Sequence, residues 1–198
     1  MNIALLGPPG AGKGTQGRLL AERIGASRVS TGDMLRAAIA SGSALGRSVE
    51  DALSKGGLVA DEIVVMLVAE RLQKADCADG AVFDGFPRTI GQARILDALL
   101  AGRKAAVDLV INLQIDDDAL WKRIEQRKSD GSARPDDTAA TLKDRLVAYH
   151  RTVPPLLEYY KLQGKLNSVN SMEPIVAVRD AITRAVHRQE RSRLSPIS

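Results

Sequence analysis

The sequence predicts an α/β protein built on a parallel β-sheet with helices on both faces. Short apolar segments of strand length alternate with longer segments of helical periodicity along the chain, a pattern typical of such a sheet. Residues 107–115 form a nearly continuous apolar run, as expected for a strand that is covered on both sides. The chain has 198 residues, which is enough for one sizeable core but too few for two full domains.

Five segments are expected to form strands, and three of them, 2–6, 81–84 and 107–115, are mainly apolar. The first is followed at once by a glycine-rich turn, and the third is closed by Gly85-Phe86-Pro87. The expected strands are Asn2–Leu6, Arg28–Ser30, Ala81–Asp84, Val107–Ile115 and Lys165–Val169.

The segments between these strands carry apolar residues at helical spacing. Thr31 and Asp61 are of the residue types that cap helix N-termini, and Gly25 and Gly42 are stop signals. Pro154-Pro155 predicts a kink or break between two helical stretches. The expected helices are Lys13–Ile24, the segment from Thr31 to Gly42, Ala44–Ser54, Glu62–Gln73, Ile90–Leu100, Asp117–Arg127, Thr138–Arg151, Leu156–Leu162 and Pro174–Arg188.

Composition excludes several classes of protein. The single cysteine, Cys77, rules out an internal disulfide framework and a zinc site made of cysteines. No run approaches the ~18 apolar residues of a membrane span, and the N-terminus lacks the pattern of a signal peptide. We therefore expect a cytoplasmic protein that does not bind membranes.

The balance of charge favours anionic partners. Lys and Arg number 28 against 24 Asp and Glu, which gives a formal net charge of +4. The basic region Arg184–Arg193 could suggest nucleic-acid binding, but aromatic residues for stacking are scarce, at 3% of the chain. A solvated helix end that runs into a frayed tail is the better interpretation, so no nucleic-acid partner is expected.

The strongest motif lies directly after the first expected strand. Gly7-Pro8-Pro9-Gly10-Ala11-Gly12-Lys13-Gly14-Thr15 follows a strand and opens a helix, which is the context of a phosphate-binding P-loop. Its glycines let backbone N–H groups turn toward phosphate oxygens, and Lys13 can reach the outer phosphates. Gly14 stands where the general pattern has Ser or Thr, and Thr15 follows, so the pattern does not by itself predict direct metal ligation by a hydroxyl. A plain strand–turn–helix corner is the alternative.

A second candidate position is the end of the third expected strand. Ligands of parallel sheets bind beyond the carboxyl ends of the strands, so this end and the phosphate loop should form one site. Asp84 closes a strand of the buried type, and an unpaired carboxylate there would be costly. We expect a cation or hydrogen-bond partner for Asp84.

Three motifs together resemble the adenylate kinase family, from residue 2 to about residue 186. They are residues 7–15, Ser30-Thr31-Gly32-Asp33-Met34-Leu35-Arg36 and Asp84-Gly85-Phe86-Pro87-Arg88-Thr89. The similarity continues through Gln92, Arg123, Arg127, Arg134-Pro135-Asp136-Asp137, Arg145-Leu146 and Tyr149-His150. Three motifs in order at the family's spacings are far more specific than one P-loop.

The resemblance implies a P-loop NTPase-type sheet of five parallel strands with two mobile inserts. A helical AMP-binding insert would span residues 30–59 and a lid over ATP residues 127–137, with the core formed by 1–29, 60–126 and 138–198. The lid is the short form, without the zinc-binding cysteines of some long-lid members. A monomer is the family's usual state.

The resemblance also implies the residues of each site. ATP would be bound by Gly10, Ala11, Gly12, Lys13, Gly14, Thr15, Arg123, Arg127 and Glu173. AMP would be bound by Thr31, Arg36, Gly57, Leu58, Val59, Gly85, Phe86, Pro87, Arg88, Gln92, Arg134 and Arg145. The catalytic residues would be Lys13, Arg88, Arg123, Arg127, Arg134, Arg145, Asp84 and Asp33. The two aspartates would hold Mg²⁺ through its waters, without direct metal ligation.

The activity that the resemblance implies is reversible phosphoryl transfer from MgATP to AMP, giving two ADP, for adenine nucleotide homeostasis. The acceptor is already an anionic phosphate oxygen, so no general base is required, and neither histidine suggests one. A UMP/CMP kinase of the same superfamily is the alternative, although such kinases usually carry alanine at the position of Thr31. A GTP-binding switch is disfavoured, because the sequence has no Asn-Lys-x-Asp motif.

Overall fold

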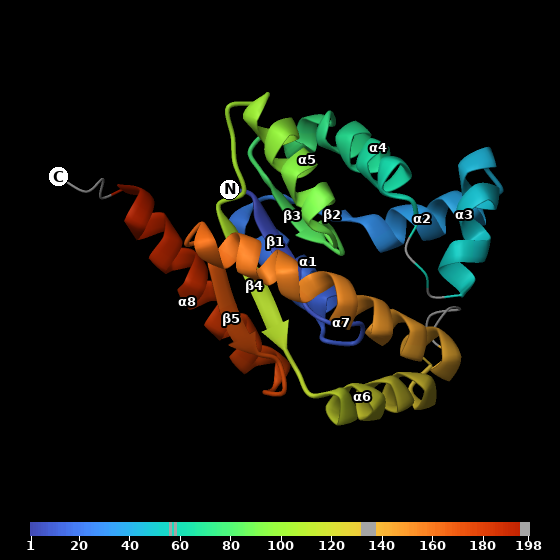
Figure 1. Cartoon of the computed structure of the whole chain (residues 1–198). Helices are drawn as coiled ribbons and strands as arrows, with labels where there is room; N and C mark the ends of the chain where they lie inside the picture. The colour runs from blue at the N-terminus through green and yellow to red at the C-terminus, as the bar shows by residue number, and fades with distance from the viewer. Residues whose placement is uncertain (56, 58, 132–137, 195–198) are drawn as a thin grey trace.

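The fold is a five-stranded, wholly parallel β-sheet with helices on both faces, as the sequence predicts (Figure 1). A computed structural model describes residues 1–55, 57, 59–131 and 138–194. The strand order is β2-β3-β1-β4-β5. The strands are β1 (Ile3–Leu6), β2 (Ser27–Ser30), β3 (Ala81–Asp84), β4 (Leu109–Gln114) and β5 (Leu166–Asn170).

The sheet's register explains where the strands begin. Residues 107–115 are predicted as one strand, but β4 starts only at Leu109, which pairs with Ile3 at the start of β1. Val107 is buried just outside the ladder. The apolar run therefore indicates which residues are buried, whereas the start of β1 determines where the backbone pairing of β4 begins.

Eight α-helices connect and cover these strands in the described part of the chain. They are α1 (Lys13–Ile24), α2 (Thr31–Ala40), α3 (Ala44–Ser54), α4 (Asp61–Leu72), α5 (Ile90–Ala101), α6 (Asp117–Ser129), α7 (Ala139–Leu162) and α8 (Ile175–Leu194). A short 3₁₀ helix, η1, covers Ala75–Cys77. None of the described helices combines the length and the apolarity needed to cross a membrane.

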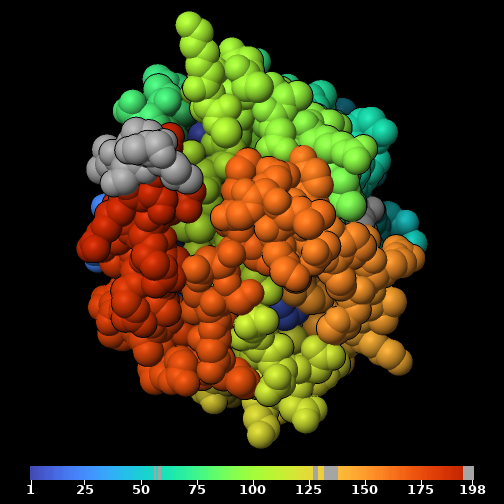
Figure 2. Space-filling model, turned by 60° about the vertical axis from the view of Figure 1, so that its left-hand side comes forward, coloured from blue at the N-terminus to red at the C-terminus, as the bar shows by residue number. Residues whose placement is uncertain are grey.

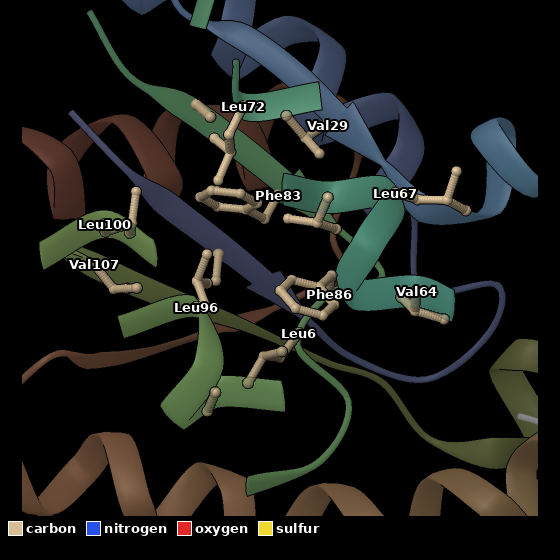
Figure 3. Packing of buried hydrophobic residues seen from close by; sticks show 14 of the residues in the cluster. Leu6, Val29, Val64, Leu67, Leu72, Phe83, Phe86, Leu96, Leu100 and Val107 are labelled. Atoms are coloured by element: carbon tan, nitrogen blue, oxygen red, sulfur yellow. The ribbon is translucent and has the colours of Figure 1, made fainter. Parts of the chain in front are cut away.

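Successive side chains of the strands point to opposite faces of the sheet and pack into two separate hydrophobic cores. Ala4 and Leu6 of β1 belong to the larger cluster, which contains residues of α4, α5 and α7. Ile3 and Leu5 point the other way and pack with residues of α1 and α8. Figure 3 shows the larger cluster, with Phe83 and Phe86 among side chains of α4 and α5. The sheet is thus covered on both faces, which explains the mainly apolar sequences of its three central strands, β3, β1 and β4.

A kink or break is predicted at Pro154-Pro155, and the break is wrong, because α7 continues through both residues to Leu162. The two prolines lie on the exposed side of the helix, so carbonyl groups left without an amide donor are close to water. Val153, Leu156 and Tyr160 on the opposite side are buried. Packing of this apolar face offsets the hydrogen bonds that the prolines remove.

Two expected helix caps are also wrong. Ser30, rather than Thr31, caps α2, because its side chain accepts a hydrogen bond from the backbone N–H of Asp33. Ala60 precedes α4, and Asp61 is the first residue of that helix, with its carboxylate turned to α5. In both cases the neighbouring element, rather than the local residue type, determines which side chain is free to cap the helix.

At the other end of the chain, α8 continues beyond the expected Arg188 to Leu194.

Candidate active site

One cavity of about 700 Å³ opens at the carboxyl edge of the sheet and gathers most of the predicted site residues. Its walls come from the phosphate loop and from α2, α5, α6, α7 and the loop between β5 and α8. Figure 2 shows atoms of the dark blue N-terminal segment at the bottom of a hollow between α7 in orange and the yellow-green α6 region. Parallel α/β sheets bind ligands at this edge.

The phosphate loop adopts the conformation that its sequence predicts. Gly10 and Gly12 have positive φ values of 85° and 90°, which other residues rarely adopt. Lys13 folds back over the loop, and its ammonium group donates to the carbonyl oxygens of Gly7 and Pro8, both at 2.8 Å. The first turn of α1 follows directly, so its backbone N–H groups and the lysine face the same space.

Four arginines, from three helices and one turn, line this cavity together with Lys13. Arg36 comes from α2, Arg88 from the turn after β3, Arg123 from α6 and Arg145 from α7. Burial lowers the pKa of Arg88, and the charges of Arg145 and Arg36 lower it further. Burial also lowers the pKa of Arg123. Like charges held together in a half-buried cavity form an electrostatic site for a polyanion.

The turn after β3 is shaped by Gly85. This residue has φ +80°, and a Cβ there would lie 3.1 Å from both Thr31 Oγ1 and an Arg88 nitrogen. Its carbonyl oxygen accepts from Arg88 Nε at 2.8 Å and from Thr31 Oγ1 at 3.1 Å. One glycine thus brings α2 and the arginine of the turn together.

Asp84 has the cationic partner that its burial predicts. Arg28 Nη2 lies 2.6 Å from a carboxylate oxygen of Asp84, and Arg28 Nη1 lies 2.8 Å from Asp33. Arg36 contacts the other oxygen of Asp33 at 2.5 Å. Burial opposes ionisation of Asp33, but the hydrogen bond from Arg36 and the charge of Arg28 hold its pKa below the usual range.

Arg123 is fixed to the loop after β5. Its guanidinium donates to the Ser171 hydroxyl at 3.3 Å and also to the Ser171 carbonyl oxygen. Ser171 is buried, and its hydroxyl donates to the carbonyl oxygen of Ala11 at 2.5 Å. This chain of contacts connects α6, the phosphate loop and the loop after β5.

The structure separates the predicted site residues into three groups. Phe86 packs in the larger core, and Asp33 is engaged by arginines; neither lines the cavity. Leu58, Arg134 and the side chain of Arg127 lie outside the described residues. The cavity is lined by Gly10, Ala11, Gly12, Lys13, Gly14, Thr15, Thr31, Arg36, Gly57, Val59, Asp84, Gly85, Pro87, Arg88, Gln92, Arg123, Arg145 and Glu173.

Sequence reasoning misses three residues that organise this site. Arg28 lies two residues before Ser30 on β2, and side chains two residues apart on a strand point to the same face. This alternation could have placed Arg28 beside the motif that begins at Ser30. In the sequence, Asp61 is typical of a helix cap and Ser171 is typical of a loop. Neither local pattern indicates the distant residue to which the side chain is hydrogen-bonded. Their roles depend on contacts across 31 and 160 residues of sequence, respectively.

Comparisons with known proteins agree with the geometry. The family model for adenylate kinase matches residues 5–165. The chain is 52% identical over 186 residues to "Adenylate kinase" of Phenylobacterium zucineum (strain HLK1), covering 94% of this chain and 97% of that protein. It is 50% identical to the protein of that name from Caulobacter sp. (strain K31), covering 94% and 98% of the two chains. For "Adenylate kinase" of Nitrobacter winogradskyi, identity is 43% over 203 residues, with 100% and 97% covered. With its fold, its phosphate loop and its basic cavity, the chain belongs to the adenylate kinase family of phosphotransferases.

Proposed function

We propose that this protein catalyses reversible phosphoryl transfer between MgATP and AMP, giving two ADP, and so balances the adenine nucleotides. The observation that carries the proposal is the single cavity in which Lys13 of the phosphate loop meets Arg36, Arg88, Arg123 and Arg145. Two nucleotides bring many negative charges to one place, and this set of cations matches that requirement.

The two nucleotides are assigned to opposite ends of this cavity. The phosphate loop, Arg123 and the loop that contains Glu173 would hold ATP. Thr31, Arg36, Gly57, Val59, the turn at Gly85 and Pro87, Arg88, Gln92 and Arg145 would hold AMP. Phe86 would support this turn from the core. Leu58, Arg127 and Arg134 keep the roles that the resemblance implies.

The chemistry needs positioning and charge neutralisation more than a covalent catalyst. The acceptor oxygen of AMP is already anionic, so no residue has to remove a proton from it. Arg88, which lines the same cavity, would contact both AMP and the transferred phosphoryl group. Arginines that are held in place before the reaction stabilise charge on the equatorial oxygens with little reorganisation.

The acidic residues fit a hydrated magnesium ion. Asp33 and Asp84 both contact one cationic group, the Arg28 guanidinium, and this closeness of the two carboxylates to a shared cation supports the proposal. Mg²⁺ usually keeps several waters, which suits carboxylates that act through water. When bound with ATP, Mg²⁺ would neutralise charge on the phosphates; Asp33 and Asp84 would orient its water ligands.

Two inserts would close over the substrates, residues 30–59 over AMP and residues 127–137 over ATP. Closure would exclude water, which competes with AMP as acceptor. A hydrogen bond from Thr141 Oγ1 to the carbonyl oxygen of Ser54, at 3.0 Å, supports contact between the first insert and α7.

We further propose a monomer in the reducing cytoplasm, consistent with a buried free thiol at Cys77.

AMP is favoured over UMP or CMP as the acceptor. Thr31 and Gln92 both line the cavity, at the end that we assign to AMP, and their side chains would form hydrogen bonds with an adenine edge. A coupled assay that compares AMP, CMP and UMP decides between them, and equal turnover with CMP would contradict the assignment.

The direct test measures ADP formation from ATP plus AMP, with and without Mg²⁺, for the wild type and Arg88→Ala. We expect Arg88→Ala to lower turnover by ~10²-fold or more, because a cation at the reacting phosphates is removed. Arg94→Ala is the matched control, since Arg94 is exposed on α5 and away from the cavity wall. Near-normal turnover of a folded Arg88→Ala protein would refute the role of Arg88.

A further inference from the structure

We infer that Asp61 determines base specificity by fixing the orientation of the Gln92 side-chain amide. The inference rests on the proposed function, because it takes Gln92 as the residue that faces the base of AMP. Asp61 belongs to the start of α4, outside the motifs that define the site, and acts as a positioning residue.

The contacts form a closed ring between the starts of α4 and α5. Gln92 Nε2 donates to one carboxylate oxygen of Asp61 at 2.7 Å, and the Thr89 hydroxyl donates to the other at 2.9 Å. Thr89 Oγ1 accepts from the backbone N–H of Gln92 at 3.1 Å. The backbone N–H of Arg88 donates to Gln92 Oε1 at 2.7 Å.

This ring permits one orientation of the amide. An ionised carboxylate can only accept, and a backbone N–H can only donate, so the Nε2 end must face Asp61 and the Oε1 end must face Arg88. Turning the amide by half a rotation would place two acceptors against each other and two N–H groups against each other. Gln92 is only 2% exposed, so water has little access to repair such a mismatch.

The fixed amide leaves a defined pattern for a ligand. One N–H of Nε2 and one lone pair of Oε1 remain after the two protein contacts are counted. Adenine offers an acceptor at N1 beside a donor at its 6-amino group, which complements this pattern. Hypoxanthine offers a donor at N1 and an acceptor at O6, which requires the reversed amide. The Asp61 carboxylate therefore selects AMP over IMP.

The first experiment compares the wild type with Asp61→Ala for AMP and IMP as acceptors. We expect the KM for AMP to rise about tenfold, with kcat changed by less than about twofold and the KM for ATP unchanged. The ratio of kcat/KM for AMP over IMP should fall by about tenfold, because reversal of the amide is then opposed only by the backbone N–H of Arg88. An unchanged ratio in Asp61→Ala, with Gln92→Ala impaired toward AMP, would overturn the inference.

Two controls separate positioning from helix stability. Glu62→Ala removes a negative charge from the same first turn of α4, and Glu62 is exposed, so its AMP:IMP ratio should equal that of the wild type. If Asp61→Ala does not fold, Asp61→Asn carries the test. Its amide can accept or donate toward Gln92, so we expect a smaller fall of the ratio, about threefold. A wild-type ratio in Asp61→Asn would contradict the inference.

A double-mutant cycle tests whether Asp61 acts through Gln92. On a Gln92→Ala background, Asp61→Ala should change the KM for AMP by less than about twofold, because the group that it orients is already gone. A full tenfold effect on that background would show a merely structural role and refute the inference. If Gln92→Ala alone leaves the KM for AMP unchanged, the assignment of Gln92 to the AMP base fails first, and the inference falls with it.

Discussion

Arg28 is the residue that joins the two aspartates, Asp33 and Asp84, beside the cavity. Its guanidinium contacts Asp84 at 2.6 Å and Asp33 at 2.8 Å, and Arg36 binds Asp33 from the other side. Burial opposes ionisation of Arg28, but its hydrogen bond and charge interaction with Asp84 raise its pKa overall. If AMP binds as proposed, its phosphate would compete with Asp33 for Arg36, and AMP binding would be linked to the acidic pair.

Substitution of Arg28 tests this dependence. We expect Arg28→Gln to lower the free energy of unfolding by about 1–3 kcal/mol, because Asp84 is buried and would lose a charged hydrogen-bond donor. Urea denaturation measures the change. Arg18→Gln is the control, because Arg18 forms an exposed ion pair with Glu22, and its loss should cost less than about 1 kcal/mol. Equal losses in the two variants would show that the contacts of Arg28 contribute no more than a surface pair.

At the scale of elements, the close packing of α2 and α3 shapes the proposed AMP insert. Gly46 faces α2, and a Cβ at this position would lie 2.1 Å from the carbonyl oxygen of Ala38 and 2.7 Å from the Cα of Ile39. Ser43 reinforces the approach, since its hydroxyl donates to Ala38 and accepts from the backbone N–H of Gly46. Only a residue without a side chain allows the two helices to meet here.

Gly46→Ala should force α2 and α3 apart. We expect a loss of about 1–3 kcal/mol in the free energy of unfolding, as for other overpacked sites. The KM for AMP should rise more than the KM for ATP, because α2 carries Thr31 and Arg36. Gly102→Ala at the end of α5 is the control, since its Cβ would meet its nearest neighbours at 3.6 Å. A Gly46→Ala protein as stable as this control would show that the helices separate without cost.

At the scale of the whole molecule, the cavity lies where both core layers and several connecting segments end. The larger core anchors α4, α5 and α7, the second core anchors α1 and α8, and a small third cluster joins α6 to α7. Ligand contacts from these elements would connect all three clusters, so binding should stabilise the whole fold.

A bisubstrate ligand, two adenosines joined through their phosphates, should raise the thermal midpoint of unfolding. At 100 times its dissociation constant the expected gain is about 2.7 kcal/mol in the free energy of unfolding. Lys13→Met should bind the ligand more weakly and show a smaller shift at the same concentration, because a cation of the phosphate loop is lost. Adenosine alone should give little shift. A shift in Lys13→Met equal to that of the wild type would contradict phosphate binding by this loop.

Local patterns predict much of this protein because their causes are local. The phosphate loop needs glycines with positive φ next to a helix start, and residues 7–15 supply both. The buried strands β1, β3 and β4 follow from mainly apolar runs. Cap assignments at Thr31 and Asp61 fail because a competing partner, Gly85 in one case and Gln92 in the other, lies far along the sequence.

By itself the sequence determined the class of fold, the phosphate loop and the three motifs that identify the family, since each depends on residue types at fixed short spacings. Tertiary structure decided that Arg28 joins Asp33 to Asp84, that Ser171 connects Arg123 to the phosphate loop, and that Asp61 orients Gln92. It also decided that α7 passes through its two prolines. The physical reason is the same in each case. These hydrogen bonds and this burial depend on which distant segments the folded sheet brings together, and the spacing of residues within one segment does not specify its neighbours.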